Sequence, residues 1–333
     1  MLPIALLERL ADGRDHSRAL LSESLALAVE EIDKQLVDLE SVGLAIVATA
    51  DDGLRLAEPI DWIEPRSIEL ALGRSTVARI ESLERSLELE STNRYLLGRQ
   101  PPESGKARIA IAEFQTAGRG RRGRSWSMPP GAGIALSASW QFEQTPGHLA
   151  ALSLAVGAAA RRAIADVTAL DIGLKWPNDL IVNQGKLGGI LVELAPLPNG
   201  GCHVVAGIGI NVNVPPSYLA KVSDFGQGAR DLSSTAPEWP IDREALAVGL
   251  IEHFIELFSG FAETGFEPYR AEWLSAHVLY GQRVELRSGS GTTVGTVRGI
   301  DSDGALVLED ETGATRHVIS GDVTIRTQHD ARD

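Results

Sequence analysis

The chain has 333 residues and a net charge of -14, with 44% hydrophobic and 23% charged residues. This composition is that of a soluble globular protein of two or three domains, and it excludes fibrous, low-complexity and disordered chains. The acidic balance opposes an affinity of the whole protein for nucleic acid or for anionic membranes, so any cationic site must be local.

Neither cysteine usage nor apolar runs indicate secretion or a membrane segment. The single cysteine, Cys202, cannot form an internal disulfide and favours a reducing compartment. The first ten residues lack the basic leader of a secretion signal. The longest apolar run, 149–160, is shorter than the roughly 20 residues that span a bilayer. We therefore expect a cytoplasmic protein with no membrane partner.

The first 60 or so residues predict three short helices followed by a β-ribbon. Residues 3–11 form an apolar stripe, Ser17 can cap a second helix to residue 24, and Gly43 ends a third. Residues 44–56, with their turn at 51–53, then make a hairpin. This order resembles a winged helix-turn-helix domain, which we place at 1–66.

The expected DNA-contact positions of this domain are acidic. Glu30, Glu31 and Asp33 lie at the start of the third helix, and Asp51 and Asp52 lie at the tip of the ribbon. Residues 1–64 hold fourteen acids against five basic residues, a net charge of -9. Because DNA binding requires phosphate neutralisation, a scaffold or protein-contact role is favoured, and DNA binding stays open but disfavoured.

The remaining chain divides into a long mixed segment and a short β-rich one. Helical patterns cover 75–90, 149–165 and 243–261, and strand-like runs cover 108–114, 133–141, 173–182, 190–194 and 203–214. We assign 67–276 to one domain. Short strands with turns near 288–291, 301–304 and 311–313 predict a small barrel at 277–327.

The sharpest motif is the run Gly118-Arg119-Gly120-Arg121-Arg122-Gly123-Arg124, which follows an expected strand. Glycines let a backbone turn and approach a ligand, and guanidinium groups pair with carboxylate or phosphate oxygens. The run therefore suggests a flexible anion clamp. A P-loop is disfavoured because the usual lysine is arginine and prolines, not a helix, follow. A solvated basic loop or a nucleic-acid patch remains the alternative.

Two further motifs carry lysines beside expected strands. In the run 175–179, Lys175 could offset phosphate charge and Asp179 could hold Mg²⁺, although Pro-Asn-Asp by itself reads as an ordinary turn. In the run 185–193, Lys186 precedes a glycine pair and an apolar strand. This lysine fits either a surface hairpin or an ammonium presented to an acyl phosphate.

Two quieter motifs complete the set. The run 207–213 places glycines inside a strand, which weakens a sheet unless something approaches the backbone, and Asn211 there could bind a ligand. Ser91, Thr92 and Asn93 read by themselves as a helix N-cap.

In this order and at these separations, the motifs together resemble the biotin-protein ligases, whose bifunctional members also act as biotin operon repressors. The matching runs are 90–93, 113–118 with the arginine loop, 175–179, 186–193 and 207–213. The resemblance implies an α+β multidomain chain: a winged helix-turn-helix domain, a mixed-sheet catalytic domain like that of class II aminoacyl-tRNA synthetases, and a small SH3-like β-barrel. Lipoate ligases share the catalytic fold, but the arginine loop and the run 175–179 look like the biotin branch.

The resemblance also implies a reaction and its residues. Biotin and MgATP would give biotinyl-5'-AMP, and a lysine of a biotin carboxyl carrier protein would then receive the biotin. The implied catalytic residues are Arg121, Lys175 and Lys186. The implied biotin-binding residues are Ser91, Thr92, Asn93, Gln115, Gly118, Arg119, Gly120, Arg121, Lys186, Gly188 and Gly189. The implied ATP and adenylate ligands are Arg119, Arg121, Arg122, Trp126, Lys175, Asn178, Asp179 and Asn211, with Asp179 also expected to hold Mg²⁺.

The implied partner is the carrier domain of acetyl-CoA carboxylase or of another biotin-dependent enzyme. A biotin-sensing repressor, alone or in addition, and a lipoate or other acyl-protein ligase are the alternatives. Exposed sheet edges also allow a homodimer or docking of the carrier by β-augmentation.

Overall fold

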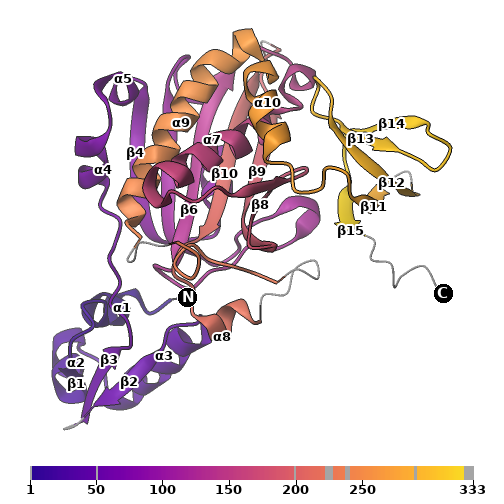
Figure 1. Ribbon diagram of the computed structural model, residues 1–333. Coiled ribbons are helices and arrows are strands. Elements are labelled where there is room, and N and C mark those ends of the chain that lie inside the picture. Colours follow the sequence, from indigo (N-terminus) through magenta and orange to yellow (C-terminus); the bar gives the residue numbers. More distant parts are fainter. Residues whose placement is uncertain are drawn as a thin grey trace.

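The computed structural model describes residues 2–49, 52–198, 200–221, 228–236, 241–288 and 291–325. The chain begins with three helices and a small sheet of order β1-β3-β2 (Figure 1). The bounds are α1 Ile4–Leu10, β1 His16–Ser17, α2 Arg18–Leu25, α3 Val29–Ser41, β2 Ile46–Thr49 and β3 Gly53–Leu56. Ser17 caps α2 by accepting from the Leu20 amide, as expected, and α3 buries Ile32, Leu36 and Leu39. The expected turn residue Asp51 lies outside the described residues.

The centre of the molecule is a mixed seven-stranded sheet of order β4-β5-β6-β10-β9-β8-β7. Only the β4–β5 pair among these is parallel. The strands are β4 Ile80–Leu89, β5 Ala107–Gln115, β6 Gly133–Phe142, β7 Gly173–Lys175, β8 Asp179–Val182, β9 Gly185–Pro196 and β10 Cys202–Asn211. The helices around it are α4 Pro65–Ala71, α5 Arg74–Val77, α6 Thr92–Leu97, α7 Leu152–Thr168, α8 Pro216–Leu219, α9 Arg243–Thr264 and α10 Glu267–Ser275, with short 3-10 turns at Arg121–Gly123 and Pro146–Leu149.

The two faces of the sheet differ in side-chain size, because alternate residues of a strand face opposite sides. Large apolar residues such as Trp140 and Val204 share one core with α7 and α9. Val205 packs with Leu96 of α6 in a separate small cluster. α9 is long and apolar enough to cross a membrane by length and composition, but half of its most apolar stretch is buried inside the protein. It is therefore a core helix (Figure 1).

The helix expected at 75–90 is wrong. α5 ends at Val77, and Ile80–Leu89 is the edge strand β4, which pairs in parallel with β5. Ile80, Leu83 and Leu87 have helical spacing, but these positions are only half-buried, and pairing with β5 outweighs the local pattern. Ser91, Thr92 and Asn93 consequently follow a strand, and Ser91 occupies the N-cap position of α6 without a side-chain capping bond.

The C-terminal part is a five-stranded antiparallel sheet of order β14-β13-β12-β11-β15. Its strands are β11 Arg283–Ser288, β12 Gly291–Ile300, β13 Leu306–Glu309, β14 Thr315–Val318 and β15 Asp322–Ile325. Asp301 and Asp310 close the turns 301–304 and 310–313, near two of the expected turn positions. The indole of Trp176 donates to the Gly304 carbonyl at 3.0 Å and ties this sheet to the central domain.

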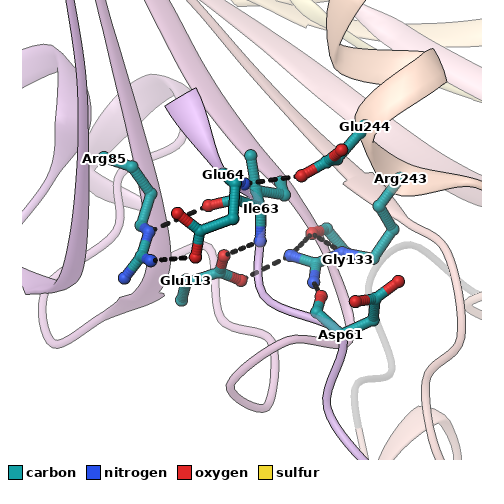
Figure 2. Close-up of polar contacts among 8 residues, drawn as sticks. All are labelled: Asp61, Ile63, Glu64, Arg85, Glu113, Gly133, Arg243 and Glu244. Carbon is teal, nitrogen blue, oxygen red and sulfur yellow. Dashed lines mark hydrogen bonds and ion pairs between the residues drawn. The ribbon is translucent and has the colours of Figure 1, made fainter. Parts of the chain in front are cut away.

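A buried ion pair anchors the segment that links the N-terminal helices to the central sheet (Figure 2). Glu113 of β5 accepts from the Ile63 amide at 2.9 Å and pairs with Arg243 of α9 at 2.5 Å. The Glu113 side chain is fully buried and that of Arg243 is 10% exposed. Arg243 also donates to the Asp61 carbonyl, and Arg85 donates to the Ile63 carbonyl (Figure 2). The linker is therefore held at fixed points on β5 and α9.

Candidate active site

A hollow of about 820 Å³, including its open mouth, lies on the sheet face opposite α7 and α9. Gly207 and Gly209 alternate with the large residues of β10, so they face this hollow, and Gly189 of β9 pairs with Gly209. A Cβ on Gly207 would lie 1.9 Å from Asn93 Oδ1, and one on Gly209 would lie 2.4 Å from the Trp126 indole. The glycines inside β10 are therefore explained by side chains that approach the backbone.

One end of the pocket is lined by uncharged hydrogen-bonding side chains, those of Ser91, Thr92, Asn93 and Gln115. The Gln115 side-chain oxygen accepts from the Thr92 amide at 2.9 Å, which fixes that side chain at the end of β5. The Ser137 hydroxyl lies 2.6 Å from the Thr92 hydroxyl and 2.7 Å from Asn93 Oδ1. Asn93 also donates to Glu193 at 3.0 Å. These polar groups form a preorganised surface for an uncharged polar ligand.

The arginine run forms a tight hairpin over the pocket. Gly120 donates to the Arg124 carbonyl at 2.7 Å, and Trp126 donates to the Gly118 carbonyl at 2.9 Å. A Cβ on Gly118 would lie 2.3 Å from the Trp126 carbonyl oxygen, so only glycine fits there. Arg119 pairs with Glu193 at 3.0 Å. The tip of the hairpin, Arg121–Gly123, is a short 3-10 turn. A P-loop would open an α-helix here, so this geometry agrees with its rejection.

The other end of the pocket is cationic. Lys186 Nζ lies 3.1 Å from Asp179 Oδ1, with both side chains less than a fifth exposed. Burial lowers the pKa of Lys175, against the opposing effect of Asp179. Burial likewise lowers the pKa of Arg121, with Asp322 opposing it. Five cationic side chains line the hollow with two carboxylates, which creates a strong site for anions. The lining cations are Arg119, Arg121, Arg124, Lys175 and Lys186.

Trp126 separates this pocket from a second, less polar hollow of about 470 Å³. The second hollow is lined by Asn211, Val214 and Tyr218 and shares Trp126 and Lys186 with the first. The Trp126 indole N–H is buried and meets no hydrogen-bond acceptor within the described part of the chain. Lys186 Nζ lies 5.8 Å from the centre of the indole ring, so cation and aromatic surface meet at the junction.

The structure brings most of the predicted site residues to one pocket. Those that line it are Ser91, Thr92, Asn93, Gln115, Arg119, Gly120, Arg121, Trp126, Lys175, Asn178, Asp179, Lys186 and Gly189.

Four predicted residues do not line the first pocket. Gly118 shapes the hairpin, and Gly188 faces the backbone of Gly209. Arg122 points to the C-terminal sheet, where it pairs with Asp322 at 2.8 Å. Asn211 lines the second hollow and donates to the Arg230 carbonyl at 3.0 Å.

Sequence reasoning found Asp179, the partner of Lys186, but missed the carboxylates that pair with the arginines and the contribution of the C-terminal sheet. Asp322 and Val323 of β15 line the pocket, as does Arg124. Glu193 holds both Arg119 and Asn93. Glu193 and Arg124 fell within quoted motifs and could have been singled out, whereas Asp322 carries no local signal because its partners lie about two hundred residues earlier.

Comparisons with known proteins agree with this geometry. Residues 87–211 match the Biotin/lipoate A/B protein ligase family, and residues 279–326 match the Biotin protein ligase C terminal domain. The bifunctional ligase/repressor BirA of Escherichia coli is 34% identical over 327 residues, covering 98% of both chains. A biotin–acetyl-CoA-carboxylase ligase of Paracoccus denitrificans is 34% identical over 242 residues, which cover 67% of this chain and 92% of the relative.

Solved structures give the same result. The biotin protein ligase of Aquifex aeolicus in complex with biotin and ATP superposes with a TM-score of 0.59 at 25% identity, covering 74% of this chain and 99% of that one. The mixed sheet, the cationic pocket and the C-terminal β domain thus define an enzyme of the biotin and lipoate ligase class. Full-length similarity narrows this assignment. The chain belongs to the biotin protein ligase family and is a ligase.

Proposed function

We propose that this protein condenses biotin with MgATP to biotinyl-5'-AMP and then transfers biotin to a lysine of a biotin carboxyl carrier protein. A carboxylate oxygen of biotin attacks the α-phosphorus, and the bond to the pyrophosphate oxygen breaks. The acceptor amine then attacks the acyl carbon, AMP leaves and the amine proton is lost. Both steps place negative charge where the cations converge, so the site must stabilise anions twice.

One observation carries this proposal: a neutral hydrogen-bonding floor and a cationic rim share one pocket. The pair of Lys186 and Asp179 forms one side of the rim, and the arginine hairpin forms the other. An acid with an uncharged polar ring would be oriented by the floor and activated at the rim. Its two ends match the two ends of biotin.

At the floor, Ser91, Thr92, Asn93 and Gln115 would orient the ureido ring. Thr92 bonds to Gln115, and Ser137 bonds to Thr92 and Asn93, so these side chains are held in place for binding. Gly120 and Gly189, which line the pocket, would pack along the ring system, and Gly118 and Gly188 would shape the backbone beside them.

At the rim, Arg119, Arg121 and Lys186 would stabilise the carboxylate and α-phosphate oxygens. Lys175 and Asn178 would align the triphosphate; Asn178 is held by its bond to the Ile190 carbonyl at 2.8 Å. Arg122 and Asn211, which do not line this pocket, would contribute at its edges.

A magnesium ion fits this site through Asp179. No group of three or more His, Cys, Asp or Glu side chains gathers anywhere in the described ranges, so a cage made by protein alone is not formed there. Mg²⁺ is usually held by one or two carboxylates together with substrate phosphates, and one carboxylate beside a phosphate-sized cationic pocket meets that requirement. The ion would neutralise the polyphosphate when bound, while Lys186, now paired with Asp179, would turn to the acyl phosphate.

The second hollow suits the adenine base. Trp126 offers a flat ring and a buried N–H that meets no acceptor among the described residues, and Val214 and Tyr218 add apolar surface. Aromatic and apolar walls with few polar groups are typical of such binding sites.

We infer three domains, at 1–66, 67–276 and 277–327. The first is a winged helix-turn-helix-like module and the last an SH3-like barrel. The acidic first module would contact protein and is disfavoured as a DNA reader, although the repressor role of the E. coli relative keeps operator binding as the second candidate. A cytoplasmic location and docking of the carrier of acetyl-CoA carboxylase along a free sheet edge complete the proposal, with homodimer formation through such an edge as the alternative use.

ATP–pyrophosphate exchange with biotin, lipoate and no acid tests the reaction directly. We expect exchange with biotin at least about a hundredfold above that with lipoate, because a site built to hydrogen-bond polar groups discriminates strongly against a ligand that lacks them. Equal exchange with lipoate would instead establish another acyl-protein ligase.

A further inference from the structure

The arginine hairpin contacts the C-terminal sheet, and its two ion pairs there share one carboxylate. Asp322, the first residue of β15, pairs through Oδ2 with Arg122 Nη1 at 2.8 Å and through Oδ1 with Arg124 Nη2 at 2.5 Å. Arg122 also donates to the Arg287 carbonyl, and Arg121 donates to the Ser320 hydroxyl, both at 3.4 Å. Two strands and a turn of the C-terminal sheet therefore contact the hairpin.

The hairpin needs an external support. Its four guanidinium groups repel one another, and its few backbone hydrogen bonds stand between flexible glycines. Arg122 has φ 57° and ψ 36°, a left-handed conformation that is strained for a non-glycine residue. Such a conformation persists when neighbouring contacts hold it, and the Arg122–Asp322 pair is that contact.

Asp322 also lies at the pocket wall itself. Its side chain is 33% exposed, comparable to those of Arg122 and Arg124, and it lines the same hollow as Arg119 and Arg121. Arg121, the residue before Arg122, lines the pocket, where burial lowers its pKa and the charge of Asp322 opposes that effect. The Asp322 carboxylate is therefore placed to orient the arginine side chains of residues 119–124.

We propose that Asp322 is a positioning residue for acyl-adenylate formation, which cross-links Arg122 and Arg124 so that Arg119 and Arg121 face the substrates. The inference rests on the proposed function for its kinetic consequence, whereas the anchoring of the hairpin stands independently. The C-terminal sheet then supports the active site, with Asp322 as the residue that pairs with the arginine hairpin.

A proteolysis experiment tests the anchoring without any substrate. Asp322→Asn removes the charge and keeps the shape; Glu311→Gln makes the same change at an exposed carboxylate that pairs with Arg283 elsewhere in the sheet. We expect trypsin to cut the ligand-free Asp322→Asn protein within 118–124 about tenfold faster than the parent, and Glu311→Gln at the parent rate. Equal cutting of all three proteins overturns the proposal.

A double-mutant cycle tests the kinetic role. Loss of a charged hydrogen bond corresponds to roughly a 10- to 100-fold fall in kcat/KM for ATP in biotin-dependent exchange. We expect Asp322→Asn and Arg122→Gln each to show such a fall, their combination to be little worse than either, and Asp322→Glu to recover part of it. Arg122→Gln lies on the surface hairpin, so it supplies the kinetic answer even if Asp322→Asn folds poorly.

The proposal fails if the falls in kcat/KM of the two single variants multiply in the double variant. It also fails if Asp322→Asn slows ATP–pyrophosphate exchange while trypsin cuts the hairpin at the parent rate. Either result would show that Asp322 acts other than through the hairpin. Absence of biotin-dependent exchange in the parent protein would remove the proposed function, while the cutting rates would still decide the anchoring.

Discussion

Arginine and carboxylate are combined in opposite ways in two regions: among the N-terminal helices one arginine pairs with two carboxylates, and at the pocket two arginines pair with one carboxylate. In the N-terminal domain, Arg18 of α2 pairs with Asp33 of α3 at 3.1 Å and also with Asp52 at the ribbon. In the pocket, Arg122 and Arg124 share one carboxylate, and further cations remain directed at the hollow. In the first arrangement two carboxylates neutralise the charge of Arg18. In the second, one carboxylate holds two arginines and leaves the cluster cationic.

This difference shows that the position of charge decides function more than its total. A chain with net charge -14 repels polyanions at long range, yet within its pocket five cations face two carboxylates. Inside a partly desolvated hollow these charges interact more strongly than on an open surface. The pocket is therefore suited to small anionic substrates, and we expect the acidic N-terminal segment to bind DNA poorly.

The largest expected effect is that of removing a pocket cation. Lys186→Ala should slow biotinyl-adenylate formation about 10² to 10³-fold, because a preorganised donor to the developing charge is lost. Lys34→Ala, at a 75% exposed lysine of the N-terminal domain, should leave the rate unchanged. Pyrophosphate release at the parental rate by the Lys186 variant would contradict the assigned role.

The next effect concerns the floor of the pocket. Gly207→Ala places a methyl group 1.9 Å from Asn93 Oδ1, so we expect a loss of about 1–3 kcal/mol in the free energy of unfolding, together with weaker biotin binding. In Gly260→Ala the added methyl group meets no described atom within 4 Å apart from its chain neighbours and the nearby backbone of α9, so this change should stabilise the helix by about 0.5–1 kcal/mol. Urea titration measures the unfolding free energy and calorimetry measures biotin binding. Equal results for the two variants would contradict the assignment of Gly207 to the floor of the pocket.

A smaller effect is expected at the surface of the N-terminal domain. Arg18→Ala should cost no more than about 1 kcal/mol in unfolding free energy, since Asp33 and Asp52 are both more than half exposed and water screens the pairs. Thermal denaturation at low and high salt measures it. A loss several times larger would mean that this surface pair, like those of the pocket, organises its surroundings.

The smallest effect is expected in a test of DNA binding. A gel shift with the organism's own biotin-operon promoter should give no specific complex at physiological salt, with or without biotin and ATP, because the third helix and the wing are acidic. A sequence-specific complex that weakens steeply as salt rises would overturn the contrast between the two regions and establish a repressor.

Sequence patterns predicted the local features and missed the long-range ones. Buried Ile32, Leu36 and Leu39 and the cap at Ser17 follow from spacing and residue type alone. The edge strand β4 does not, because its leucines have helical spacing and only pairing with β5 makes it a strand. Local patterns are overridden where tertiary contacts decide.

The sequence motifs predicted most of the residues that line the pocket. They did not predict the residues that hold these motifs in place. The glycines of β10 indicated a close approach to the backbone, but only the folded chain identifies Asn93 and Trp126 as the approaching groups. Glu113 and Asp322 act on residues 130 and 200 positions away, and no local pattern connects them. Fold class and chemistry were thus accessible from motifs, whereas the groups that hold the motifs in place required the three-dimensional arrangement.

The central claim is that the cationic hairpin and Lys186 activate a carboxylic acid as its AMP anhydride in this pocket. The most direct measurement is incubation of the protein with biotin, MgATP and an apo carrier domain, followed by mass spectrometry of both proteins. We predict bound biotinyl-5'-AMP when the carrier is omitted, and one biotin on one carrier lysine when it is present. Neither adenylate nor modified carrier, under conditions in which biotin and ATP both bind, would contradict the claim.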